Sequence, residues 1–111
     1  MKNNLITLAF VLIGKIGFGQ TTPAAVVAEK IVQRMKDSLS LTESQRSGIY
    51  SVNLQINTQK AAARQAYGGT DSLRIKIQQV ENRRDSLYGP ILTPAQFSQY
   101  KQKKQALISG N

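Results

Sequence analysis

The pentapeptide Leu-Thr-x-x-Gln occurs twice in this chain, as L-T-E-S-Q at residues 41–45 and as L-T-P-A-Q at residues 92–96. Each copy predicts a helix start. The Thr side chain can accept a hydrogen bond from a free backbone N–H of the first turn, and the Gln can return one to the Thr N–H. Pro94 favours the second start further, because its φ is already helical and its missing N–H is not needed. The residues of these two capping boxes are Leu41, Thr42, Gln45, Leu92, Thr93 and Gln96.

The first 19 residues have the pattern of a secretory signal peptide. A charged start and an apolar run over residues 5–13 precede small residues at Gly17 and Gly19, which offer a cleavage site. A membrane anchor is the alternative, but the apolar segment is shorter than the roughly 20 residues that span a bilayer, and Lys15 interrupts it. We therefore predict that residues 1–19 are removed during export to the periplasm.

The predicted mature domain, residues 20–111, is strongly basic and lacks both Cys and His. Loss of Lys2 and Lys15 leaves 13 of the 15 basic residues against 6 acidic ones, a net charge of +7. Without Cys, the chain has no disulfide framework, no thiolate metal site and no lipid anchor at the cleavage point. The export signal and the lack of aromatic-flanked basic clusters disfavour nucleic acid. Acidic or amphipathic protein surfaces remain the better candidate partners.

Apolar spacing predicts two helices between residues 24 and 66. In the first, over residues 24–39, an apolar residue recurs at every fourth position, at Val27, Ile31, Met35 and Leu39. The second follows the first capping box to about residue 66. Its apolar face carries Ile49, Val52, Ile56 and Ala63, widened by Tyr50, Leu54 and Ala61. The pair Gly68-Gly69 then ends this helix, because glycine adopts the left-handed conformation common just past a helix end.

A third and a fourth helix follow. Thr70 or Asp71 is expected to cap the third, which would form a tight hairpin with the second. Its heptad-like row is Leu73, Ile77, Val80, Arg84, Leu87 and Ile91, with one charged member. The second capping box opens a last, short helix with Phe97, Tyr100 and Leu107 inward and Lys101, Lys103 and Lys104 outward. No segment has the pattern of a strand, so we predict an all-α fold.

The apolar rows predict a thin core. A helix of about 24 residues spans roughly 36 Å, so the second and third helices would make a long, narrow hairpin with few large side chains. Chains this small usually need disulfides, metals or oligomerisation for stability. With no Cys and no His, we expect a homodimer, or an open surface that binds something apolar.

The chain resembles the Spy/CpxP periplasmic family, which is known for repeated Leu-Thr-x-x-Gln motifs. The two copies lie 51 residues apart (93 − 42), and the second, followed by Phe97, has the Leu-Thr-Pro-x-Gln-Phe form seen in the family. The resemblance covers roughly residues 24–107 and implies a cradle-like homodimer of helical hairpins with short flanking helices. It also implies one of two activities, ATP-independent chaperoning of unfolding proteins or accessory inhibition of an envelope-stress sensor kinase.

Basic and apolar side chains between the two motifs are the candidate client-binding residues. We expect them to bind unfolded or acidic proteins, or an envelope sensor domain. The alternative for each charge is an ordinary solvated helix face, and the Arg84 stem could pack while its guanidinium reaches water. The candidates are Arg46, Ile49, Ile56, Lys60, Arg64, Arg74, Lys76, Ile77, Val80, Arg83 and Arg84.

Catalysis, cofactors and metals are disfavoured. Without His or Cys, the general bases left are isolated carboxylates and lysines, and no Gly-rich phosphate loop or nucleophile elbow occurs. Glu81 and Asp85 could share a hard cation, but nearby Arg83, Arg84 and Lys76 favour ion pairing. Contact between the lysines of the last helix and an anionic membrane surface is a weaker alternative.

Overall fold

A computed structural model of the chain describes residues 22–109, which form four helices and no strand. The helices are α2 (Pro23–Leu39), α3 (Glu43–Tyr67), α4 (Ser72–Tyr88) and α5 (Pro94–Ser109). The all-α prediction is confirmed for this part of the chain. The predicted signal peptide, residues 1–19, lies outside the described residues.

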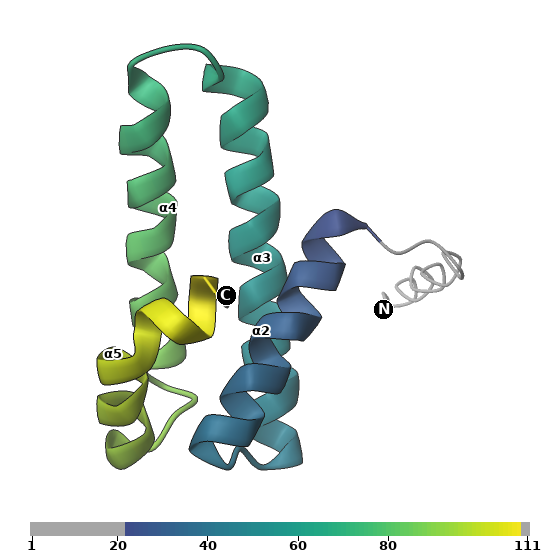
Figure 1. Ribbon diagram of the computed structural model, residues 1–111, viewed down its shortest axis with the longest axis vertical. Helices are drawn as coiled ribbons and strands as arrows, with labels where there is room; N and C mark the ends of the chain where they lie inside the picture. The colour runs from purple at the N-terminus through teal and green to yellow at the C-terminus, as the bar shows by residue number, and fades with distance from the viewer. Residues whose placement is uncertain (1–21, 110–111) are drawn as a thin grey trace, which may run out of the picture.

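Helices α3 and α4 run side by side in opposite directions and are joined by a short turn (Figure 1). Helix α2 packs along the first part of α3, and α5 packs against α2 near the base of α4. The ends of α3 and α4 nearest the turn stand clear of α2 and α5, at the top of Figure 1. These uncovered ends leave surface on both sides of the α3–α4 pair.

Both predicted capping boxes form. Thr42 Oγ1 accepts from the Gln45 N–H at 3.1 Å, and Gln45 Oε1 accepts from the Thr42 N–H at 3.0 Å. The corresponding distances between Thr93 and Gln96 are 3.1 Å and 2.9 Å. An N-cap of this kind contributes about 1 kcal/mol to stability.

The two motifs also bind each other, which the sequence analysis did not anticipate. Gln45 Nε2 donates to Gln96 Oε1 at 2.6 Å, and Gln96 Nε2 donates back to Gln45 Oε1 at 3.2 Å. Each amide donates once more to a backbone carbonyl, Gln45 to Ile91 at 3.1 Å and Gln96 to Leu39 at 3.2 Å. The starts of α3 and α5 are therefore joined by paired side-chain amides.

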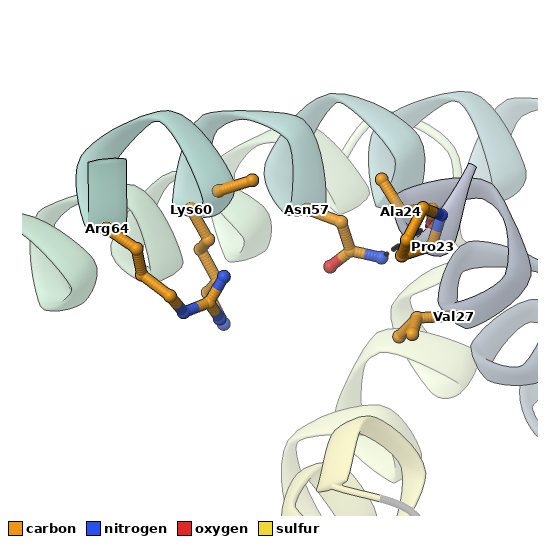
Figure 2. A pocket seen from close by; sticks show the side chains of 7 residues that line it. Pro23, Ala24, Val27, Asn57, Lys60 and Arg64 are labelled. Carbon is orange, nitrogen blue, oxygen red and sulfur yellow. Dashed lines mark hydrogen bonds between the residues drawn. The ribbon is translucent and has the colours of Figure 1, made fainter. Parts of the chain in front are cut away.

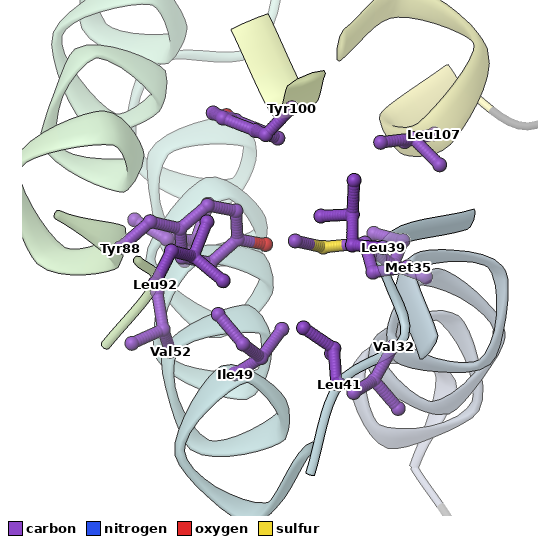
Figure 3. Packing of buried hydrophobic residues seen from close by; sticks show 12 residues of the cluster. Val32, Met35, Leu39, Leu41, Ile49, Val52, Tyr88, Leu92, Tyr100 and Leu107 are labelled. Atoms are coloured by element: carbon purple, nitrogen blue, oxygen red, sulfur yellow. The ribbon is translucent and has the colours of Figure 1, made fainter. Parts of the chain in front are cut away.

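The hydrophobic core lies beside this junction, where the four helices meet (Figure 3). Leu41 and Leu92, the first residues of the two motifs, are buried in it, and the ring centroids of Tyr88 and Tyr100 lie 4.9 Å apart, edge to face. The other members of this cluster are Ile31, Val32, Met35, Leu39, Ile49, Val52, Ile56 and Leu107.

Two local predictions are wrong. Val27 was expected to face inward but is 43% exposed, because the buried face of α2 includes Ala28 and Val32 instead. Asp71 makes no side-chain cap on α4, and the Thr70 hydroxyl instead donates to the Tyr67 carbonyl at 2.6 Å. At the glycine pair, Gly69 is the residue with the left-handed backbone, at a φ of 83°.

Candidate functional site

Three of the predicted contact residues do not lie on a surface. Ile49 and Ile56 are 0% exposed and belong to the hydrophobic core, because their face of α3 packs towards α2 and α4. Arg84 is also 0% exposed. The prediction that these three residues contact a client is therefore wrong, and so is the alternative that the Arg84 guanidinium reaches water.

Arg84 is buried because its guanidinium finds partners inside the molecule. Its Nε donates to Glu81 Oε2 at 2.6 Å, while Nη1 lies 2.9 Å from Asn53 Oδ1 and 3.0 Å from the Tyr88 hydroxyl oxygen. The Tyr88 hydroxyl donates to Asn53 Oδ1, and burial raises the pKa of Tyr88 to about 12. These hydrogen bonds give the buried polar groups of Arg84, Asn53 and Tyr88 partners, without which their burial would cost free energy.

This polar network links three helices. Asn53 Nδ2 donates to the Ala28 carbonyl at 3.3 Å, so α2 is joined through α3 to Arg84 and Tyr88 on α4. The sequence analysis missed Asn53 and Tyr88. The sequence did contain a signal. Asn53 is a polar residue on the predicted apolar face of α3, and the apolar row of the next helix, α4, contains an arginine that could be its partner.

Glu81 connects the buried network to the surface. Its carboxylate is 2.5 Å from Lys60 Nζ on α3 and 3.9 Å from Lys104 Nζ on α5. Burial on its own would raise the pKa of Glu81, but hydrogen bonds and positive charge from Arg84 and Lys60 outweigh it and lower the pKa. Glu81 forms ion pairs as predicted, but of the three expected cations only Arg84 takes part. Lys60 of α3 and Lys104 of α5 pair with it in place of Lys76 and Arg83.

Asp85 ties α4 to α5 in the same way. It accepts from the Tyr100 hydroxyl at 2.7 Å and from Lys104 Nζ at 3.0 Å, and Lys101 Nζ lies 3.8 Å away. Burial opposes ionisation here too, yet these bonds lower the pKa of Asp85. Lys101 faces outward as predicted, with 52% of its side chain exposed, whereas Lys104, with 30% exposed, contacts this carboxylate instead.

The side of the α3–α4 pair that faces α2 and α5 is hollowed into an open bay. It consists of two pockets of about 170 Å³ and about 640 Å³ that share Lys60. In Figure 2, the side chains of Lys60 and Arg64 extend from α3 on the side where Val27 of α2 lies. The bay is lined by Pro23, Ala24, Val27, Asn57, Lys60, Ala61, Arg64, Ile77, Gln78, Glu81, Lys101, Gln102, Lys104, Gln105, Ile108 and Ser109.

The opposite side of the same pair carries a second hollow, which we call the distal groove. Its volume is about 410 Å³. On α3 the lining residues of the bay and of the groove lie on roughly opposite sides, because each residue advances about 100° around a helix. The groove is lined by Gln59, Ala62, Ala63, Ala66, Tyr67, Lys76, Gln79, Val80 and Arg83.

The predicted surface residues are thus divided between two sides. Lys60, Arg64 and Ile77 line the bay, and Arg74 lies beside Ile77 in an adjoining pocket near the turn. Another three, Lys76, Val80 and Arg83, line the distal groove. Arg46 lies apart from both, at the start of α3, where it pairs with Glu29. No single face therefore contains all the predicted contacts.

Comparison of the chain with known family models, curated proteins and solved structures finds no match. The resemblance to the Spy/CpxP family therefore rests on the residues quoted for it. None of the helices in residues 22–109 combines the length and the apolar character that a membrane span requires. In the same residues, no three Asp or Glu side chains gather into a possible metal site.

Removing Arg84 should strongly destabilise the protein. The substitution Arg84→Ala leaves Asn53 and Tyr88 with buried polar groups and Glu81 without one cation, so we expect the free energy of unfolding to fall by about 3–5 kcal/mol. The matched control is Arg83→Ala, which removes an exposed arginine one position away and should change stability by less than about 0.5 kcal/mol. Urea denaturation measures both, and equal effects would contradict the network.

Acid should weaken the fold through Glu81 and Asp85. Their folded pKa values lie below the ordinary values of 4.5 and 3.8, so their pairing stabilises the protein above those values. That stability is lost as the pH falls through the lowered pKa values. Below about pH 4.5 we expect a decline in the free energy of unfolding that is shallower in Glu81→Gln but unchanged in Glu43→Gln, an exposed control. Denaturant titrations at a series of pH values measure it, and an unchanged slope in Glu81→Gln would contradict the role of this pair.

Proposed function

We propose that this protein is an exported, ATP-independent chaperone of the holdase type, which holds unfolding or acidic protein segments in the bay. The observation that supports this most is the bay itself, an open surface on which apolar and positively charged side chains lie together. Exposed apolar surface beside polar groups is typical of protein-binding sites. The openness of the bay suits varied, extended segments better than one small ligand.

The side chains of the bay match what an unfolding protein exposes. Val27 is 43% exposed, and Ile77 and Ile108 contribute further partly buried apolar surface. Arg64 is exposed, lines the same pocket as Val27 and makes no ion pair among the described residues. The apolar groups would bind exposed core residues of a client, and the charge would attract acidic segments.

The proposal extends to assembly and location. We propose that α3 and α4 act as the hairpin of a Spy/CpxP-like cradle, that two chains form a homodimer, and that residues 1–19 direct export to the periplasm. Support for dimerisation comes from large apolar side chains left in solvent, of which Ile75 is the most exposed at 60%. A second copy would cover such groups.

Aggregation of an unfolding client tests the activity. At near-stoichiometric ratios without ATP, the purified protein should suppress light scattering by an acidic client, and added salt should weaken the effect by screening the basic side chains. The double variant Val27→Ser/Arg64→Ser should suppress less, because it removes an apolar and a basic group from the bay. The control Val26→Ser/Lys30→Ser makes the same changes on exposed α2 residues that do not line the bay.

The outcomes separate the proposal from its alternative. No suppression at low salt, or equal loss in both double variants, would contradict holding in the bay. Capture of one envelope sensor domain, without any effect on unfolding clients, would instead support a regulatory interaction protein.

A further inference from the structure

The distal groove lies outside the site proposed above. It shares no lining residue with the bay and lies on the other side of the α3–α4 pair. Its apolar surface comes from Ala62, Ala63 and Ala66 of α3, from Val80 of α4, and from Tyr67 at the end near the turn. The groove is therefore a mainly apolar channel between two helices.

We propose that the distal groove binds an acidic, amphipathic α-helix of a partner protein. This would give the molecule a second interaction surface, one with a defined ligand geometry. The shape of the groove selects a helix, and its charges select an acidic one.

The case for a helix rests on backbone hydrogen bonding and on size. The backbone groups of α3 and α4 are already bonded within their own helices, so the walls offer an extended strand little to pair with. A helix brings its own satisfied backbone. The three alanines allow its axis to approach closely, at the short end of the roughly 8–10 Å usual for packed helices.

The length of the groove determines how many apolar side chains of a partner helix can bind in it. From Gln59 to Tyr67 it follows nine residues of α3, which span about 12 Å along the helix axis. That length accommodates about two turns of a partner helix. Apolar side chains at positions i, i+3 or i+4, and i+7 would then fill it, as in other helix-in-groove complexes.

The case for acidic flanks rests on Lys76 and Arg83. They lie seven residues apart on α4, roughly 10 Å along its axis, and both line the groove. Neither makes an ion pair among the described residues, and no acidic residue lines the groove. A partner helix with Asp or Glu at two positions beside its apolar anchors, j and j+7, would match both charges.

Neighbouring side chains hold both cations in place. Lys76 Nζ lies 5.1 Å from the centre of the Tyr67 ring, and Arg83 Nη1 donates to Gln59 Oε1 at 3.2 Å. Each of these neighbours also lines the groove. The positive charges are thus positioned at the edge of the apolar channel before any partner binds, which lowers the entropic cost of binding.

A designed peptide tests the inference. The probe is a fluorescent helical peptide of about 18 residues with Leu and Ala at i, i+3, i+4 and i+7 on one face. Glu occupies two other positions, j and j+7, along the edge of that face. Anisotropy at low salt should show saturable binding to the full protein. A scrambled peptide of the same composition, which lacks the apolar face, should bind at least about tenfold more weakly.

Charge reversal locates the binding site. Lys76→Glu/Arg83→Glu should weaken binding about tenfold or more, because like charges would then face each other. Lys30→Glu/Lys103→Glu is the matched control, with the same change in net charge on exposed residues that line neither the groove nor the bay. A peptide with Lys in place of Glu should bind the Lys76→Glu/Arg83→Glu variant better than it binds the unchanged protein. Circular dichroism would check that both variants remain helical.

These outcomes are distinct from those of the chaperone test. Absence of peptide binding, equal weakening in the two reversal variants, or no rescue by the Lys peptide would each overturn the groove proposal while leaving holding in the bay untouched. Conversely, peptide binding that responds only to Lys76 and Arg83 would support it, even if client aggregation is not suppressed.

Discussion

Two glutamine side chains hold the base of this molecule together, because Gln45 and Gln96 each bind their own helix start and each other. A capping box accepts Glu as readily as Gln, since capping needs only an oxygen. The contact between the boxes needs an N–H donor as well. Two glutamates here would present facing carboxylates that repel and would leave the Ile91 and Leu39 carbonyls without these donors. This requirement explains in physical terms why both copies of the motif end in Gln.

The rest of the architecture follows from that junction. Helices α3 and α5 start at one place. Helix α2 packs along the first part of α3, and α5 packs against α2 near the base of α4. Buried Arg84 then fixes α4 against α3, and through Asn53 against α2. Both constraints act on the lower part of the α3–α4 pair. The distal groove lies on the part near the turn, where only α3 and α4 line it, and the bay lies where α2 and α5 approach the other side of the pair.

Local features of this fold were predictable, and contacts between helices were not. Capping residues and glycines act through their own backbone, so the starts of α3 and α5 could be placed from sequence alone. Helical periodicity identified an apolar row on α2 but did not show which side of the helix would face α3. Val27 was therefore expected in the buried place that Ala28 occupies. Arg84 was recognised as unusual. Its partners Asn53 and Tyr88 stand 31 residues before it and four after it, and only the packing of α3 on α4 brings Asn53 within reach. For the same reason, the residues predicted to form one contact surface are divided in the structure between the bay, the distal groove and the buried interior.

A double-mutant cycle on Gln45 and Gln96 tests the central claim, that the two motifs form one structural unit. Unfolding free energies of the unchanged protein, Gln45→Ala, Gln96→Ala and the double variant isolate the interaction between the two amides from the separate caps. We expect a coupling of about 1–2 kcal/mol, because the first substitution already removes the paired hydrogen bonds that the second would break. Additive effects, within about 0.3 kcal/mol, would mean that the two Leu-Thr-x-x-Gln motifs are independent helix caps and would contradict the account.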